Sequence, residues 1–164
     1  MAVSLSRRAA CAGLAAAWCA GPAVAQDVPA RYSAIQVDVG PLYAKGLGPY
    51  AGAVRATLGR ALATEFGPAV GGRSARLVVR IDAISLRSYV GPGRSGIFGT
   101  NSQTDYLEGE ALVIGPRGEV VSRLPQLSAV PSSSGGAYYL PDAEERRLFA
   151  LTAHFAGWLK RRLG

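Results

Sequence analysis

Apolar and polar residues alternate with a period of two along four segments, which predicts four β-strands. The segments are residues 32–39, 76–89, 104–114 and 119–124. In the second segment the apolar parity changes near Ala83, and a single extra residue there would account for the change, so we expect a β-bulge. Pro125 cannot donate a ladder hydrogen bond, so the fourth strand either lies at a sheet edge or ends there.

Two further segments repeat their apolar residues at spacings of three and four, which predicts amphipathic helices. The first covers residues 49–66, and the second follows Asp142, which can form a reciprocal N-terminal cap with Glu145. We expect the apolar stripe of the second helix to be buried, and loss of Trp158 to loosen the domain. That stripe comprises Leu148, Leu151, Phe155, Trp158 and Leu159.

The order of these elements predicts the fold class. A strand, a helix, three strands and a helix form an α+β two-layer sandwich, with a four-stranded mixed sheet and both helices on one face. A right-handed crossover makes the first two strands parallel, and the later strands form an antiparallel meander. Residues 42–48 and 131–136 are predicted to be connections, and residues 26–164 a single domain.

The first 25 residues match a secretory signal peptide. Arg7 and Arg8 precede an Ala-rich run over residues 9–20, and Ala23 and Ala25 occupy the positions that a signal peptidase recognises. We expect cleavage after Ala25 and a periplasmic or secreted protein, exported by the general or the twin-arginine route. The apolar run is too short for a stable span, so no membrane span is expected in the mature form.

Cleavage would remove both cysteines, Cys11 and Cys19. Neither has the neighbours that bacterial lipid modification requires, so an unanchored protein is expected. Removing 25 of the 164 residues leaves 139 without a thiol, which excludes disulfides and cysteine-based metal sites. His154 is the single histidine, and no G-x-S-x-G motif could pair with it. We therefore expect no metal site and no cofactor.

The expected mature chain has 16 Lys and Arg residues against 11 Asp and Glu residues, a net charge of about +5. This balance favours anionic partners, such as an envelope protein or an anionic lipid or glycolipid surface, although solubility alone would also account for it. The chain has no Lys/Arg block and no stripe of basic and aromatic residues, so nucleic acid is not an expected partner.

Gly91, Gly93 and Gly96 have the G-x-G-x-x-G spacing of a dinucleotide-binding loop. That site needs a helix immediately after the glycines, whereas residues 97–104 show no helical period. We interpret the segment as a connection between antiparallel strands. Its tip could bind a partner, because long loops often carry function. The candidate residues there are Arg94, Ile97 and Phe98.

Tyr138 and Tyr139 precede the last helix and are further candidates for partner binding. The alternative is that Tyr139 or Leu140 packs against the start of the helix.

We expect eight polar and charged residues of the predicted sheet to lie on the face away from the helices. They are Gln36, Asp38, Arg76, Arg80, Asp82, Glu108, Glu110 and Arg123. Glu108 and Glu110 share a side, and paired carboxylates can perform acid–base chemistry or bind a hard cation. We favour cross-strand ion pairing with Arg80 and Arg76, which solvated sheets commonly show.

The βαβββα order behind a leader, with the hairpin sequence TDYLEGEALVIGPRGEVV at its centre, resembles small bacterial envelope accessory proteins. The resemblance implies a role in envelope assembly; some such proteins assist lipopolysaccharide assembly or curli secretion. They are commonly lipoproteins, whereas this chain lacks a suitably placed cysteine. Three hypotheses follow. The first is a non-catalytic periplasmic binding or assembly-accessory module. The others are a small hydrolase that uses Asp105, Glu108 or Glu110, and a structural subunit of an envelope complex.

Overall fold

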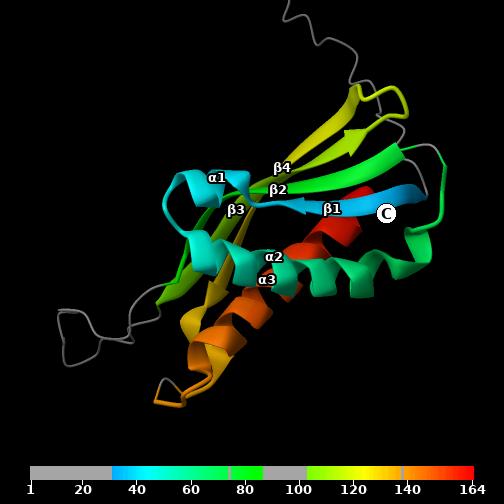
Figure 1. The fold of residues 1–164 in the computed structure, drawn as a ribbon. Coiled ribbons are helices and arrows are strands. Elements are labelled where there is room, and N and C mark those ends of the chain that lie inside the picture. Colours follow the sequence, from blue (N-terminus) through cyan, green and yellow to red (C-terminus); the bar gives the residue numbers. More distant parts are fainter. Residues whose placement is uncertain (1–30, 74, 87–102, 138) are drawn as a thin grey trace, which may run out of the picture.

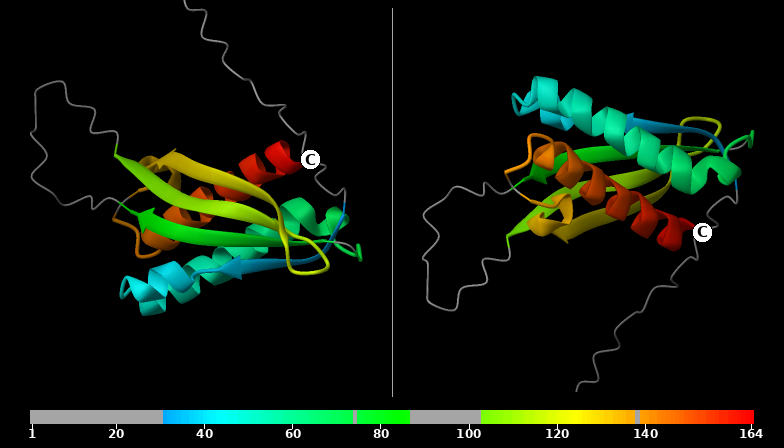
Figure 2. Two further views of the ribbon diagram at one scale, coloured as in Figure 1. Left: turned by 90° about the horizontal axis from the view of Figure 1, so that it is seen from above. Right: turned by 90° about the horizontal axis from the view of Figure 1, so that it is seen from below.

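The computed structural model describes residues 31–73, 75–86, 103–137 and 139–164. Its sheet has the order β1-β2-β3-β4. β1 (Tyr32–Asp38) and β2 (Ala75–Ser85) are parallel, while β3 (Thr104–Ile114) and β4 (Val120–Pro131) extend the sheet in antiparallel fashion. Two long helices, α2 (Gly48–Phe66) and α3 (Ala143–Leu163), cover one face of the sheet (Figures 1 and 2). The α+β two-layer sandwich predicted from the sequence is confirmed.

Short helical turns occupy two of the predicted connections. α1 (Gly40–Ala44) lies partly within the segment interpreted as a connection after β1, and η2 (Ser132–Gly135) is a 3₁₀ turn within the predicted loop at 131–136. A third such turn, η1 (Gly67–Ala69), follows α2. Elements of three to five residues are shorter than two helical turns, so they are too short to show the apolar repeat from which a helix is predicted.

The predicted β-bulge is present in β2. The pairing of β2 with β3 shifts register between Ile81 and Ala83, and Ile84 returns to the helix-facing side opposite Leu107. Gly109 lies opposite Ile81, and a Cβ atom at Gly109 would lie 2.2 Å from the backbone oxygen of Arg80. The strands approach so closely at the bulge that only glycine fits there.

β4 continues through Pro125 to Pro131, so the expectation that this strand might end at Pro125 was wrong. The expected edge position is confirmed, because β4 is the outermost strand beside β3. At an edge, the missing N–H of a proline costs no ladder hydrogen bond. The carbonyl oxygen of Pro125 accepts a hydrogen bond of 2.9 Å from Nη1 of Arg162 in α3.

The core lies between the sheet and the two long helices. Leu148, Leu151, Phe155 and Leu159 of α3 are buried in it, together with the apolar stripe of α2. Trp158 is the exception, since 46% of it is exposed, and the expected burial of this residue was wrong. It lies at the border of the stripe, where His154 and Arg161 hold its ring at the surface.

The N-terminus of α3 also departs from the prediction. Asp142 occupies the N-cap position, but its side chain makes no capping hydrogen bond. Instead, its carboxylate forms an exposed ion pair of 3.0 Å with Arg146, one turn into the helix. No helix in the described part of the chain is long and apolar enough to cross a membrane.

Candidate functional site

The two glutamates of β3 have different surroundings. Glu110 is 9% exposed and lies between two arginines of the open sheet face, 3.0 Å from Arg123 and 3.7 Å from Arg80. Arg80 also pairs with Asp82 at 3.1 Å. Glu108 is exposed and forms no ion pair with any residue that the structure describes. Cross-strand ion pairing is therefore present at Glu110, with Arg123 in place of the expected Arg76.

Asp105 lies on the opposite, helix-facing side of β3 and is 1% exposed. Its carboxylate accepts a hydrogen bond of 2.7 Å from Nε of Arg147, a second from Nη2 of the same side chain, and one of 2.8 Å from Ser132 Oγ. Arg147 is itself 5% exposed, so the ion pair is buried. Its partners from α3 and η2 fix the start of the last helix against the sheet.

These placements separate the carboxylates named in the hydrolase hypothesis. Asp105 lies beneath α3, whereas Glu108 and Glu110 lie on the open face, so Asp105 shares no face of the sheet with either glutamate. Among the described residues, no group of three or more His, Asp, Glu or Cys side chains could hold a metal ion.

Most of the predicted partner-binding loop is outside the described residues. Arg94, Ile97 and Phe98 lie there with the whole G-x-G-x-x-G segment, and so does Tyr138. Tyr139 is 75% exposed beside the start of α3, so it does not act as a buried staple.

His154 is at the surface of α3. Its Nε2 accepts a hydrogen bond of 3.0 Å from the indole nitrogen of Trp158, which requires the neutral imidazole. Burial, and then the charge of Arg161, lower the pKa of His154.

One hollow of about 650 Å³ lies between α2 and the start of α3. Tyr50 lines it, and its buried hydroxyl has no hydrogen-bond partner among the described residues. Burial, and then the charge of Glu144, raise the pKa of Tyr50 to about 12, so the phenol stays protonated. Arg60 and acidic residues share the rim, so the hollow favours neither sign of charge.

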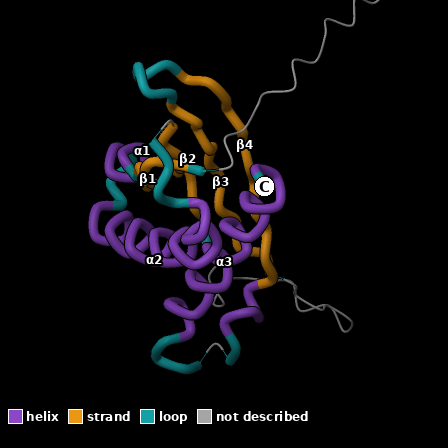
Figure 3. The backbone as a smooth tube through the Cα atoms, turned by 90° about the vertical axis from the view of Figure 1, so that its right-hand side faces the viewer, coloured by secondary structure: helices purple, strands orange, loops and turns teal. Residues whose placement is uncertain are grey.

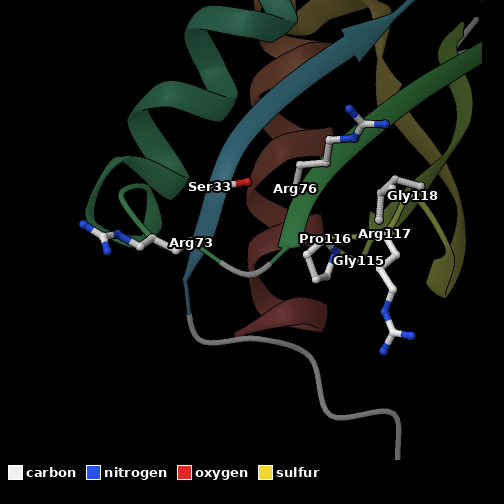
Figure 4. A pocket seen from close by; sticks show the side chains of 8 residues that line it. Ser33, Arg73, Arg76, Gly115, Pro116, Arg117 and Gly118 are labelled. Carbon is white, nitrogen blue, oxygen red and sulfur yellow. The ribbon is translucent and has the colours of Figure 1, made fainter.

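A second hollow, of about 490 Å³, lies where strands meet at one end of the sheet (Figure 4). Three arginines line it: Arg73 and Arg76 around the start of β2, and Arg117 in the turn between β3 and β4. The remaining lining residues are Ser33, Ile114, Gly115, Pro116 and Gly118. Because β1 and β2 begin where β3 ends and β4 begins, the sheet topology brings these distant segments together.

The arginines of this hollow favour an anion, and the one carboxylate that lies against a described lining residue is that of Glu119, beside Gly115. None of the three arginines forms an ion pair with a carboxylate of the described residues. Ser33 Oγ donates to the carbonyl oxygen of Ala75 at 3.0 Å, and the amide of Gly115 donates to the carbonyl oxygen of Glu119 at 2.8 Å. The guanidinium groups are therefore the main donors left for a ligand, and they match phosphate or carboxylate oxygens.

The hollow belongs to a larger cationic surface, which we call the cationic end. The last turn of α3 reaches the same end of the molecule, as the position of the C-terminus shows in Figures 1 and 3. Lys160 there lies 5.2 Å from the ring centre of Phe66, the last residue of α2. The cationic end comprises the Lys and Arg residues of these segments: Arg31, Arg73, Arg76, Arg117, Lys160, Arg161 and Arg162, the last with its Nη1 hydrogen-bonded to the carbonyl oxygen of Pro125.

Acidic side chains are few at this end. Within the described segments that form it, Glu65 and Glu119 are the acids that accompany the seven cations. Of the described arginines away from this end, Arg80, Arg123, Arg146 and Arg147 each form an ion pair with a carboxylate, whereas Arg55 and Arg60 of α2 do not. The surplus positive charge of the described chain is therefore concentrated at one end rather than spread over the surface.

The fold and this surface define a two-layer α+β protein with a cationic end. No protein-family model matches the chain, and no curated protein matches it. Among solved structures, the chain is similar to a candidate lipoprotein from Caulobacter crescentus, with 13% identity and a TM-score of 0.44 over 79% of this chain and 86% of that one. It is also similar to a minor lipoprotein from Acinetobacter baumannii, with 11% identity and a TM-score of 0.40 over 82% of this chain and 92% of that one. Neither description names an activity or a ligand.

Proposed function

We propose that this protein is a non-catalytic binding module of the bacterial envelope, and that its cationic end binds a phosphate-bearing partner. The observation that carries the proposal is the hollow lined by Arg73, Arg76 and Arg117, whose guanidinium groups have no carboxylate partner among the described residues. Arginine is the side chain best suited to phosphate, because its planar fork of donors matches two phosphate oxygens.

The envelope location rests on the N-terminal leader, with its basic start, Ala-rich run and small residues before Gln26. The non-catalytic role is supported by two of the three carboxylates of β3, Asp105 and Glu110. Asp105 is neutralised by a buried arginine and Glu110 by two arginines of the sheet, so each has a structural partner rather than a substrate-facing position.

The arrangement also limits the expected affinity. Exposed ion pairs contribute at most about 1 kcal/mol each, so a single free phosphate group should bind weakly, with a Kd on the order of 1 mM. Inorganic pyrophosphate carries more charge and should bind more tightly than orthophosphate. NMR of the arginine side-chain Nε–H groups during a pyrophosphate titration measures both the affinity and the residues involved.

Two triple variants that each remove three positive charges test whether the hollow is the binding site. Replacing Arg73, Arg76 and Arg117 together with Gln should abolish the pyrophosphate-dependent shifts. The control replaces Lys45, Arg55 and Arg60 with Gln, which removes the same charge from the C-cap of α1 and from α2. If both triple variants lose binding equally, the effect is one of net charge, and the hollow is not the site.

A further inference from the structure

We propose that the cationic end docks on the surface of a bilayer that contains anionic lipids, with Trp158 at the interface. This inference rests on the proposed function, and it identifies the phosphate-bearing partner as a lipid surface. The first observation is the spread of the guanidinium groups. In Figure 4 the side chains of Arg73, Arg76 and Arg117 extend in three different directions around the hollow. Such a spread fits several neighbouring headgroups better than one small anion.

The second observation is that apolar side chains lie among these cations. Val70 follows η1 and pairs with Tyr32 at the start of β1, while Val120 and Val121 begin β4 directly after the turn that carries Arg117. The three valines are 41%, 50% and 42% exposed. Scattered exposed apolar residues are ordinary, but aliphatic and aromatic side chains interleaved with arginine are typical of surfaces that enter the headgroup region of a bilayer.

Trp158 supplies the aromatic member of this group. This residue, in the last two turns of α3, is 46% exposed, and the guanidinium carbon of Arg161 lies 4.3 Å from the centre of its ring. Indole rings concentrate at membrane interfaces, because one part of the ring is apolar and the N–H is polar. Arg161 can remain among phosphates while the ring contacts the acyl boundary, as long basic side chains do at such interfaces.

Charge selects a bilayer with anionic lipids over a neutral one. Seven cations from four separate segments accompany Glu65 and Glu119 at this end. An anionic leaflet attracts clustered Lys and Arg residues within about one Debye length of its surface. The cations come from strand ends, a turn and a helix end, and so they offer a broad surface rather than a groove for an acidic peptide.

Vesicle binding tests the inference. The protein is recovered after export, its N-terminus is established by mass spectrometry, and all variants are prepared identically so that any remaining leader contributes equally. Co-sedimentation compares vesicles of equal parts phosphatidylglycerol and phosphatidylcholine with vesicles of phosphatidylcholine alone. We expect binding to the anionic vesicles only, with affinity falling as NaCl is raised. Replacing Arg73, Arg76 and Arg117 with Gln should weaken it on the order of 100-fold, and the Lys45, Arg55 and Arg60 control by much less.

The fluorescence of Trp158 shows whether this residue enters the bilayer interface. The difference between the emission spectra of the parent protein and Trp158→Phe isolates this residue from Trp18, the other tryptophan of the chain. Anionic vesicles should shift the Trp158 emission to shorter wavelength and protect it from iodide. Vesicle binding without any change in Trp158 emission would overturn the proposed orientation.

Pyrophosphate binding separates failure of this inference from failure of the proposed function. If pyrophosphate binds at the hollow but no vesicle does, the bilayer proposal is wrong and the anion site stands. Capture of an acidic protein by the cationic end, again without vesicle binding, has the same consequence. If neither pyrophosphate nor vesicles bind, both proposals fall.

Discussion

The buried ion pair between Asp105 and Arg147 offers the sharpest test of how this fold is held together. Replacing Asp105 with Asn keeps the size of the side chain but removes its charge. The guanidinium of Arg147, 5% exposed, is then left in the interior without its counter-ion. Removing one member of a buried pair typically costs 3–5 kcal/mol, because the remaining charge stays desolvated. We therefore expect Asp105→Asn to lower the free energy of unfolding by about 4 kcal/mol.

Urea unfolding followed by circular dichroism measures this loss. For a domain of this length, about 4 kcal/mol corresponds to a decrease in Tm of about 10–15 °C. The m-value should stay constant if only the native state has changed. The double variant Asp105→Leu with Arg147→Met should recover much of the loss, because apolar side chains of similar volume remove both charges at once.

The exposed pair between Asp142 and Arg146 is a matched control, since it lies one turn away around the same helix start. Its side chains are 57% and 41% exposed, so Asp142→Asn should cost less than about 1 kcal/mol. Equal losses for Asp105→Asn and Asp142→Asn would refute the reasoning, because burial of the charge would then have no measurable consequence.

Three further predictions concern single positions. Gly109→Ala should cost about 2 kcal/mol or more in urea unfolding, because its Cβ would meet backbone at 2.2 Å, whereas Gly59→Ala, in open space within α2, should stabilise by about 1 kcal/mol; equal effects would contradict the close approach. Phe155→Ala should lower the free energy of unfolding by about 3–5 kcal/mol and Trp158→Ala by only about 1 kcal/mol, since the first side chain is fully buried and the second is half exposed. A larger loss for Trp158→Ala than for Phe155→Ala would contradict the observed exposure of Trp158. Because burial and the Arg161 charge lower the pKa of His154 in the folded state, the unfolded chain binds the proton more readily. Stability should therefore fall as the pH drops below about 6.5, and His154→Gln should reduce that slope in urea midpoints measured between pH 5 and 7.

Local alternation was enough to predict most of the sheet. β3 was predicted with its observed bounds, and the parity change near Ala83 located the bulge, because both features depend only on which face successive side chains take. Pro125 shows the limit of such reasoning. A proline is harmful in an inner strand and harmless at an edge, so the length of β4 depends on its place in the sheet.

Trp158 shows a different limit. Spacing alone includes it in the apolar stripe of α3, three residues after Phe155. The residues that decide its exposure are His154 and Arg161, which share its border of the helix and interact with its ring. The spacing of apolar residues identifies the centre of a buried helix face well. It identifies the residues at the border of that face poorly, because their burial depends on how far the neighbouring strand or helix extends.

The functional groups were harder to predict than the fold. Asp105 and Arg147 are 42 residues apart and meet only when α3 packs on β3. One signal was present in the sequence: Asp105 has the same parity as Leu107 and Ala111, so it is a charged residue on the face predicted to be buried. A buried carboxylate requires a hydrogen-bonded or cationic partner, and the basic residues at the start of the last helix, Arg146 and Arg147, are candidates for that partner.

The described arginines include two groups with different roles. Arg147 is buried against a carboxylate, so its charge is part of the stability of the fold. Arg73, Arg76 and Arg117 are exposed and unpaired within the described residues, so little folding energy depends on them. Because like charges gathered at one end repel each other, their removal should leave stability unchanged or slightly raised. The proposed binding of an anionic partner makes the opposite demand on the same side chains, so their removal should abolish binding while it leaves the fold intact.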